Sequence, residues 1–163
     1  MRESVGTAWL YGLVLIFTLI FSGFLVLALA YSKAYKLKNE MTSIIEKYEG
    51  FTNTGANNGG GSIKLINQYL QNSGYNTMGV CPEGSNYGVS DLSNYDNIED
   101  IVPGKRYYYC ISRHDGDGCK KIFRVTLFYN FNLPVFGQLR KYMISGQTNE
   151  MVYAYIGKES IAC

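Results

Sequence analysis

A long run of uncharged, apolar residues near the N-terminus constrains this chain more than any other feature. No Asp, Glu, Lys or Arg occurs between Ser4 and Ser32, and residues 8–31 read AWLYGLVLIFTLIFSGFLVLALAY. As an α-helix this run would span roughly 36 Å, more than the ~30 Å hydrocarbon core of a bilayer. A cleaved secretory signal is the alternative, but the run is too long for one and Ala28-Leu29-Ala30 is its only weak exit site. We therefore predict a retained transmembrane segment at residues 8–31.

The side chains of this segment suggest how it would sit among lipids and other helices. Aromatic rings occur near both ends, at Trp9 and Tyr31, where amphipathic rings prefer the membrane interface. Glycines inside the segment would let a second helix approach closely. The residues expected to take part in helix packing or membrane contact are Trp9, Gly12, Leu19, Gly23 and Leu25.

The helix is expected to continue beyond the membrane as an amphipathic half. Apolar residues recur at helical spacing from Leu37 to Tyr48, and neither Gly nor Pro occurs between Tyr31 and Gly50. The pattern predicts a continuous helix from about Thr7 to Glu49, roughly 65 Å long. Residues 1–49 thus form an N-terminal helix with one half apolar all round and the other half apolar on a single stripe.

The remaining chain divides into a connector and a globular domain. Residues 50–61 are rich in Gly and Asn and predict a flexible connector. Ser62 is expected to cap a short helix that ends at Gly74. A polar loop follows as far as Gly104, with a short strand at residues 77–81. Residues 62–163 are therefore expected to form one globular α+β domain.

The last third of the chain has the alternating pattern of β-strands. Strands are predicted at 106–112, 121–131, 141–148 and 151–156, and the short loops between them favour antiparallel hairpins. An amphipathic helix laid on such a sheet closes one hydrophobic core. The residues expected to form this helix-to-sheet core are Leu37, Met41, Ile44, Ile45, Phe123, Val125, Leu127 and Tyr129.

Charge and cysteine content give opposite indications of orientation. Lys33, Lys36 and Lys38 follow the apolar run and, by the positive-inside rule, would place the C-terminal domain in the cytoplasm. All the cysteines, however, lie in that domain, and an even number in a small Gly-rich domain is typical of an oxidising compartment. We predict the domain outside the cell; free buried thiols in a cytosolic domain are the alternative.

The cysteines Cys81, Cys110, Cys119 and Cys163 allow three disulfide connectivities. We favour Cys81–Cys110, which would restrain the long polar loop, together with Cys119–Cys163, which would restrain the chain's end. A Cys110–Cys119 bridge across the turn between them is possible, but it would close a short loop and constrain the unfolded chain least.

Several functional classes are disfavoured by composition. The net charge of +2 is too small and too mixed for a nucleic-acid partner, and a single His gives no pair of catalytic base and orienting group. Residues 114–118 contain Asp-x-Asp-Gly but lack the other ligands of a calcium loop, so a hairpin turn explains them better. We expect neither an enzyme nor a metal site nor a cofactor.

A helix of this kind followed by a small antiparallel sheet resembles the type IV pilin architecture. Within residues 123–151, Val125–Tyr129 is similar to a family strand of pattern V-x-[VL]-x-[YF], and Leu133–Phe136 is similar to the apolar-Pro-apolar loop that follows it. Ile144–Thr148 is similar to the family's next strand. The opening residues 2–17 also resemble the family's start, so the chain resembles the TadE-like pseudopilins of tight-adherence (Tad) pili.

The resemblance implies a structural subunit of a bacterial cell-surface filament. Expected partners are the membrane, copies of itself or other pilin-like subunits through the N-terminal helix, and a pilus assembly platform. Family members carry a cleavable Gly and a Glu at the fifth position of the mature helix, whereas here Tyr11 is five residues after Gly6. Both an uncleaved chain and one numbered after a removed leader stay open. The functional alternative is a bitopic surface protein that binds or adheres without polymerising.

Overall fold

The computed structural model describes residues 2–52, 61–94, 98–116, 120–130, 132–133, 137–138, 142–151, 154–157 and 159–161. The helices are α1 (Arg2–Lys47) and α2 (Ser62–Asn72). The strands are β1 (Gly50–Thr52), β2 (Gly79–Val80), β3 (Tyr87–Val89), β4 (Glu99–Asp100), β5 (Arg106–Tyr107), β6 (Tyr109–Asp115), β7 (Lys121–Tyr129), β8 (Asn132–Leu133), β9 (Gly137–Gln138), β10 (Tyr142–Gln147), β11 (Ala154–Gly157) and β12 (Glu159–Ile161).

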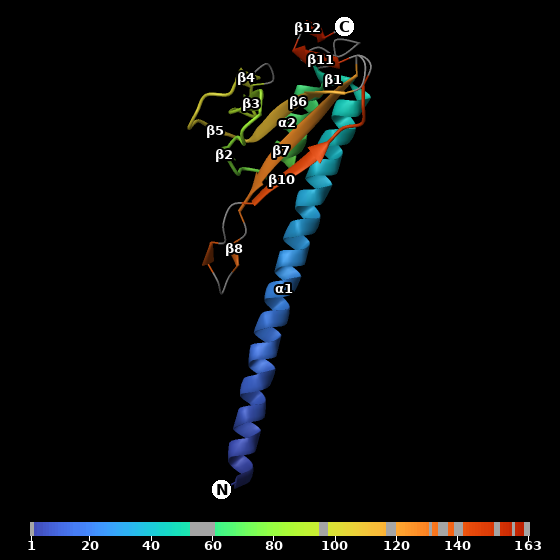
Figure 1. The fold of residues 1–163 in the computed structure, drawn as a ribbon. Coiled ribbons are helices and arrows are strands. Elements are labelled where there is room, and N and C mark those ends of the chain that lie inside the picture. The colour runs from blue at the N-terminus through green and yellow to red at the C-terminus, as the bar shows by residue number, and fades with distance from the viewer. Residues whose placement is uncertain are drawn as a thin grey trace.

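α1 is one uninterrupted helix, as the sequence predicted, although it ends at Lys47 and not at Glu49. The backbone leaves the helix through Glu49, with φ 53°, and Gly50, with φ 129°. Positive φ is a conformation that favours Gly, and Gly50 adopts it where the chain turns away from the end of the helix. Figure 1 shows the N-terminal half of α1 projecting alone, while its C-terminal half lies along the strands and α2. We call the strands and α2 together the head.

The head is built around an antiparallel sheet with strand order β10-β7-β6-β3-β4. Side chains of α1, α2, β6 and β7 share one core, so both helices cover the same face of this sheet. The predicted α+β layout, a long helix packed on a small antiparallel sheet, is therefore confirmed (Figure 1).

A second, smaller sheet corrects the predicted connector. Gly50–Thr52 is not flexible chain but the buried strand β1, which pairs in parallel with β11. β11 in turn pairs antiparallel with β12, so the last strands do not extend the main sheet. Met151, expected to begin a strand reaching Ile156, makes only an isolated bridge with Lys121. Gly61, the last residue of the predicted connector, precedes α2, and residues 53–60 lie outside the described residues.

The predicted strand at 106–112 is split at Tyr108 into β5 and β6. In an unbroken strand Tyr107 and Tyr109 would point to the same face. The break instead sends the fully buried Tyr107 to the outer face of the sheet and the fully buried Tyr109 to the face covered by the helices. Two short strands, β3 and β4, also occupy the region expected to be polar loop, and they extend the sheet beyond β6.

The start of α2 differs from the prediction that Ser62 is its cap. Gly61 holds the cap position, and a Cβ there would collide with the Thr52 carbonyl, so no capping side chain fits. Ser62 instead ties α2 to β1, since its hydroxyl donates to the Gly50 carbonyl at 2.7 Å and accepts from the Thr52 N–H at 2.9 Å. The other end is as expected, because Gly74, with φ 71°, terminates the helix.

Candidate functional site on the N-terminal helix

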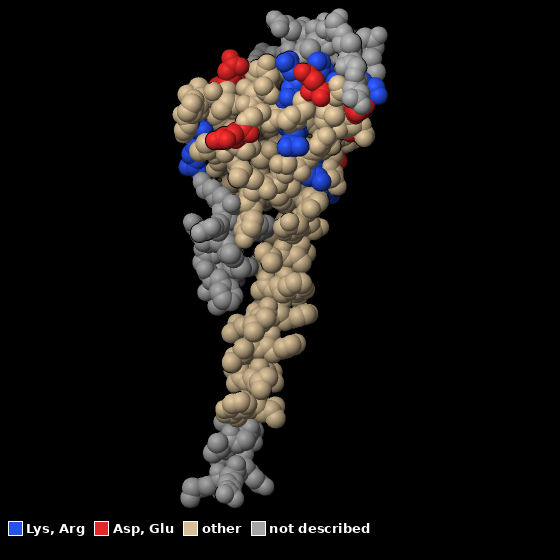
Figure 2. Space-filling view, viewed as in Figure 1, with Lys and Arg blue, Asp and Glu red and all other residues tan. Residues whose placement is uncertain are grey.

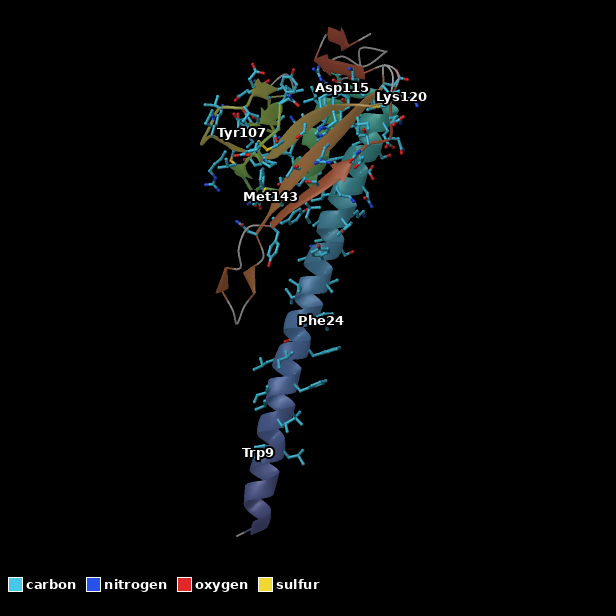
Figure 3. All side chains as sticks on the ribbon, in the orientation of Figure 1. Trp9, Phe24, Tyr107, Asp115, Lys120 and Met143 are labelled. Atoms are coloured by element: carbon cyan, nitrogen blue, oxygen red, sulfur yellow. A yellow bond between two sulfur atoms is a disulfide. The ribbon has the colours of Figure 1, made fainter. Side chains whose placement is uncertain are left out.

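The projecting half of α1 carries a continuous apolar surface. The segment passes length and composition criteria for a membrane-crossing helix, and its apolar window has no side chain buried in the protein. Figure 3 shows Trp9 and Phe24 extending outward from the helix. The large apolar side chains exposed here are Trp9, Leu10, Tyr11, Leu13, Val14, Leu15, Ile16, Phe17, Leu19, Ile20, Phe21, Phe24, Leu25, Val26, Leu27, Leu29, Tyr31 and Tyr35. A patch of this extent is typical of a surface that meets lipid or another protein.

Gly12 and Gly23 of this half lie on one side of the helix. Gly12 and Gly23 are eleven positions apart, which at 100° per residue leaves an offset of roughly 20°. A Cβ built at either position meets nothing within 4 Å. Leu19 lies between them on the same side, whereas Leu25 faces nearly the opposite direction. Both glycines are therefore open to close approach by another helix.

The C-terminal half of α1 is held firmly by the head. Leu37, Met41 and Ile45 are buried in the core with Phe123, Val125 and Leu127 of β7. Ile44 and Tyr129, the remaining residues predicted for this core, pack half-buried against it.

Close approach and a polar link complete the attachment of α1. A Cβ at Gly146 of β10 would lie only 2.7 Å from Lys38 Cγ and 3.0 Å from Thr42 Oγ1, so Gly is needed where β10 meets the helix. The Asn149 N–H also donates to Glu46 Oε1 at 2.8 Å. These contacts fix the direction in which the projecting half leaves the head.

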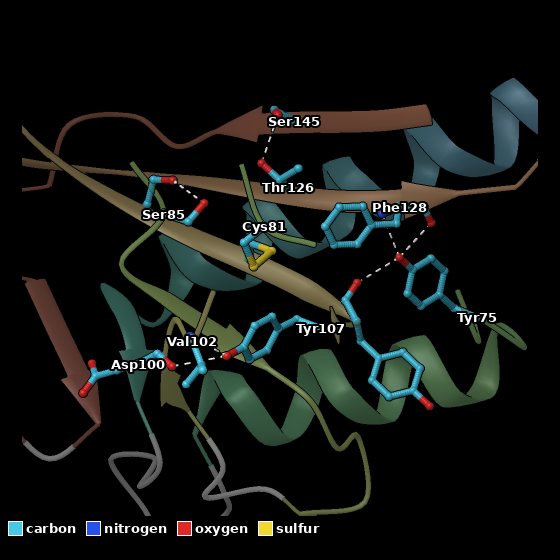
Figure 4. The surroundings of a disulfide bond; sticks show 12 residues. Tyr75, Cys81, Ser85, Asp100, Val102, Tyr107, Thr126, Phe128 and Ser145 are labelled. Atoms are coloured by element: carbon cyan, nitrogen blue, oxygen red, sulfur yellow. Dashed lines mark hydrogen bonds between the residues drawn. A yellow bond between two sulfur atoms is a disulfide. The ribbon is translucent and has the colours of Figure 1, made fainter. Parts of the chain in front are cut away.

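The outer face of the sheet contains a second core that the sequence pattern did not reveal. Cys81 and Cys110 form a disulfide, with their Cα atoms 5.7 Å apart, as in the pairing that we favoured (Figure 4). Cys110 packs with the buried rings of Tyr107 and Phe128. Cys119 and Cys163 lie outside the described residues, so their predicted bridge stays a prediction. The Cys81–Cys110 disulfide fastens the loop after β2 to the main sheet.

Two glycines make room for the rings of this second core. A Cβ at Gly79 would collide with the Phe128 ring, and one at Gly88 would collide with the Tyr107 ring. β2 lies within the short strand predicted at residues 77–81. Gly88, by contrast, lies in a strand without apolar alternation, which is why β3 was hard to recognise. The only sequence signal is the repeated placement of Gly beside Tyr or Val, which by itself is weak.

Two tyrosines of the head, Tyr75 and Tyr109, serve its interior as hydrogen-bonding groups. The Tyr75 hydroxyl accepts from the Phe128 N–H at 2.9 Å and lies 2.9 Å from the Tyr108 carbonyl. The Tyr109 hydroxyl donates to Oδ1 of the buried Asn67 at 3.0 Å. Burial raises the pKa of both phenols. These tyrosines therefore stay neutral hydrogen-bonding groups that order the head.

The charged side chains visible in Figure 2 lie on the head, and the stretch of the projecting helix that is not grey there carries none. Asp115, considered above as part of a calcium loop, pairs with Lys121 at 2.6 Å, and that hydrogen bond lowers the pKa of the carboxyl. Among the described residues no group of three His, Cys, Asp or Glu side chains is arranged to hold a metal ion. The described residues therefore present two kinds of surface, an apolar one on the projecting helix and a polar one on the head.

Comparison with known proteins adds no relative. No family model matches the chain, and no curated protein or solved structure matches it either. Functional inference therefore rests on the shape and chemistry described above.

Proposed function

We propose that this chain is a pilin-like structural subunit, anchored by α1, that assembles into or primes an extracellular filament of the type IV, Tad-like kind. The observation that carries the proposal is the division of one rigid helix into two environments. From Ala34 onward one side of α1 is buried in the head, whereas before Ala34 the helix is exposed as an apolar rod. A rod of this kind is insoluble alone and requires lipid or other helices around it.

Exchange between these two environments supplies the mechanism. In the membrane, lipid tails cover the projecting half; in a filament, the same half packs against copies of α1. Because lipid and protein are similarly apolar, helix association depends on close packing and not on the hydrophobic effect. Gly12 and Gly23 offer that close packing on one side of the helix. The head, attached rigidly to the rod, would then form the filament's outer surface.

The disulfide supports an extracellular head. Cys81–Cys110 is buried in the second core, and such bonds persist in oxidising compartments. The lysines after the apolar run favour the opposite orientation, but the positive-inside rule is a statistical bias, and whole domains translocate largely regardless of charge. We therefore propose a single-pass chain in a bacterial membrane with its head outside.

Recovery of the chain in sheared filaments tests this proposal against the alternative of a surface protein that never polymerises. Cells producing the chain are sheared without detergent, and released filaments are analysed by mass spectrometry. A subunit appears in the filament fraction and is lost when Gly23→Leu blocks close helix approach. The matched variant Leu25→Ile, on the other side of the helix, keeps assembly. Retention of all the chain in the membrane fraction, with filaments intact, would favour the non-polymerising alternative.

A further inference from the structure

A groove lies where the projecting half of α1 enters the head. It has a volume of about 420 Å³ and is formed by α1, the end of α2 with its following loop, and the end of β7. We call it the neck groove. Its lining residues are Lys33, Lys36, Leu37, Tyr69, Ser73, Gly74, Tyr75, Asn76, Thr77, Tyr129 and Asn130. It thus combines two cations with aromatic rings and several hydrogen-bonding groups.

The depth of the groove along α1 matches the headgroup layer of a bilayer. Lys33 and Lys36 follow Tyr31, the end of the apolar segment, by two and five residues. At 1.5 Å per residue these positions lie roughly 3 and 8 Å beyond the hydrocarbon boundary. The polar layer on each side of a bilayer is about 5–8 Å thick. A helix inserted through its apolar segment therefore holds both lysines among lipid headgroups.

The charge of the groove is complementary to an anion. Both lysines are exposed, and no ion pair or hydrogen bond to either is recorded within the described part of the chain. Burial raises the pKa of Tyr69 in the groove lining, and the negative charge of Glu40 raises it further. Glu40 lies a helical turn beyond Lys36, away from the membrane. The membrane side of the groove is consequently its positive side.

From depth, charge and lining together, we propose that the neck groove binds the phosphate of an anionic phospholipid headgroup. The lysines attract the phosphate, and Asn76 and Asn130 provide hydrogen-bonding groups around the rest of the headgroup. This inference rests on the proposed membrane insertion of α1. It adds a lipid partner that would hold the head at a fixed height, and that a subunit must release when it leaves the bilayer.

Competition between lipids tests the proposal. The full chain is reconstituted in nanodiscs with equal amounts of phosphatidylglycerol and phosphatidylcholine, and lipid retained by the protein is measured by native mass spectrometry. A lysine near the surface contributes about a fivefold preference for anionic lipid. Lys33→Gln should therefore lower the phosphatidylglycerol preference about fivefold, and Lys33→Gln with Lys36→Gln about 25-fold.

A charge-matched control separates a site from a net-charge effect. Lys47→Gln with Lys64→Gln removes the same charge at the far end of the head, and this variant should keep the preference. Equal loss in both double variants, or no loss in either, would overturn the groove as a lipid site. Displacement of phosphatidylglycerol by inorganic phosphate, but not by chloride at equal ionic strength, would identify a free-phosphate site and also overturn the proposal.

Carbonate extraction of vesicles containing the same proteins distinguishes the two levels of inference. A chain that resists extraction yet shows no lipid preference contradicts the neck groove alone. A chain that is extracted was never inserted, which contradicts the proposed function and the groove's partner with it.

Discussion

The two halves of α1 bury their apolar side chains to opposite extents. In the projecting half, Phe24 is 63% exposed and Leu29 is 65% exposed, whereas Met41 and Ile45 in the other half are fully buried. Backbone conformation is the same in both, since α1 is continuous from Arg2 to Lys47. The difference therefore lies in the side-chain pattern and in what surrounds it.

The two side-chain patterns require different surroundings for the two halves of α1. The apolar stripe on the C-terminal half of α1 needs one complementary apolar face, and the odd-numbered residues of β7 supply that face within the same chain. A helix that is apolar all round needs an apolar environment on every side, which no part of the described head provides. Stability of the head and insertion of the rod should consequently respond to different mutations.

Truncating a core side chain gives the largest expected effect. Ile45→Ala should lower the free energy of unfolding of the head by about 2–5 kcal/mol, because it leaves a cavity in the core. Leu25→Ala removes a similar side chain from the projecting half and should leave the head's stability unchanged. Thermal unfolding in detergent, followed by tyrosine circular dichroism, measures both. Equal destabilisation by the two variants would show that the halves are not independent.

A charge in the projecting half should have the converse effect. Leu19→Arg should cost about 3 kcal/mol of insertion free energy near the helix centre, so membrane retention falls while the head unfolds at its usual temperature. Ser43→Arg, on the exposed side of the C-terminal half, is the control and should affect neither property. Full membrane retention of Leu19→Arg would argue against a spanning helix.

Reduction of the disulfide should destabilise the head and leave the projecting half of α1 unchanged. The Cys81–Cys110 bond joins residues 29 apart, and its loss should destabilise the head by about 2–4 kcal/mol. Cys81→Ala with Cys110→Ala isolates this bond, and peptide mapping without reductant tests for the accompanying Cys119–Cys163 bridge. Helical signal from the projecting half should persist. A Cys110–Cys119 peptide, or an unchanged melting temperature, would refute the assignment.

Alkaline pH should also destabilise the head, with a smaller effect than loss of the disulfide. Burial, together with the nearby Tyr69, raises the pKa of Tyr129 to about 12 from 10.0. A pKa that is higher in the folded state leaves stability intact below about pH 10 and removes it as pH rises toward 12. Tyr129→Phe should thus show a shallower fall of melting temperature across this window. Parallel curves for the two proteins would mean that Tyr129 titrates normally when folded.

The sequence predicted the parts of the fold that depend on periodicity. The helix, its change from all-round apolar to striped near Leu37, and the alternation of β7 are regular patterns that reflect burial directly. The pairing of Cys81 with Cys110 was favoured on grounds of loop restraint. Each of these features repeats over several residues or depends on a distinctive side chain.

The features that were missed depend on contacts between distant residues. β1 is a strand because it pairs with β11, about a hundred residues later, and no local signal marks it. The break at Tyr108 places Tyr107 in the second core, where Gly79 and Gly88 leave room for aromatic rings from other strands. The neck groove, likewise, joins three elements whose polar residues look like ordinary loop positions in the sequence.

Photo-crosslinking from position 19 tests the central claim most directly, namely that the projecting half exchanges lipid for helices of other subunits. A photoreactive residue replaces Leu19, on the side of the helix that carries Gly12 and Gly23, and cells are irradiated before membranes and sheared filaments are separated. We predict lipid adducts in the membrane fraction and chain-to-chain adducts in the filament fraction, mapped by mass spectrometry to α1 of another subunit. Lipid adducts alone, with no chain-to-chain adduct in any fraction, would contradict the account.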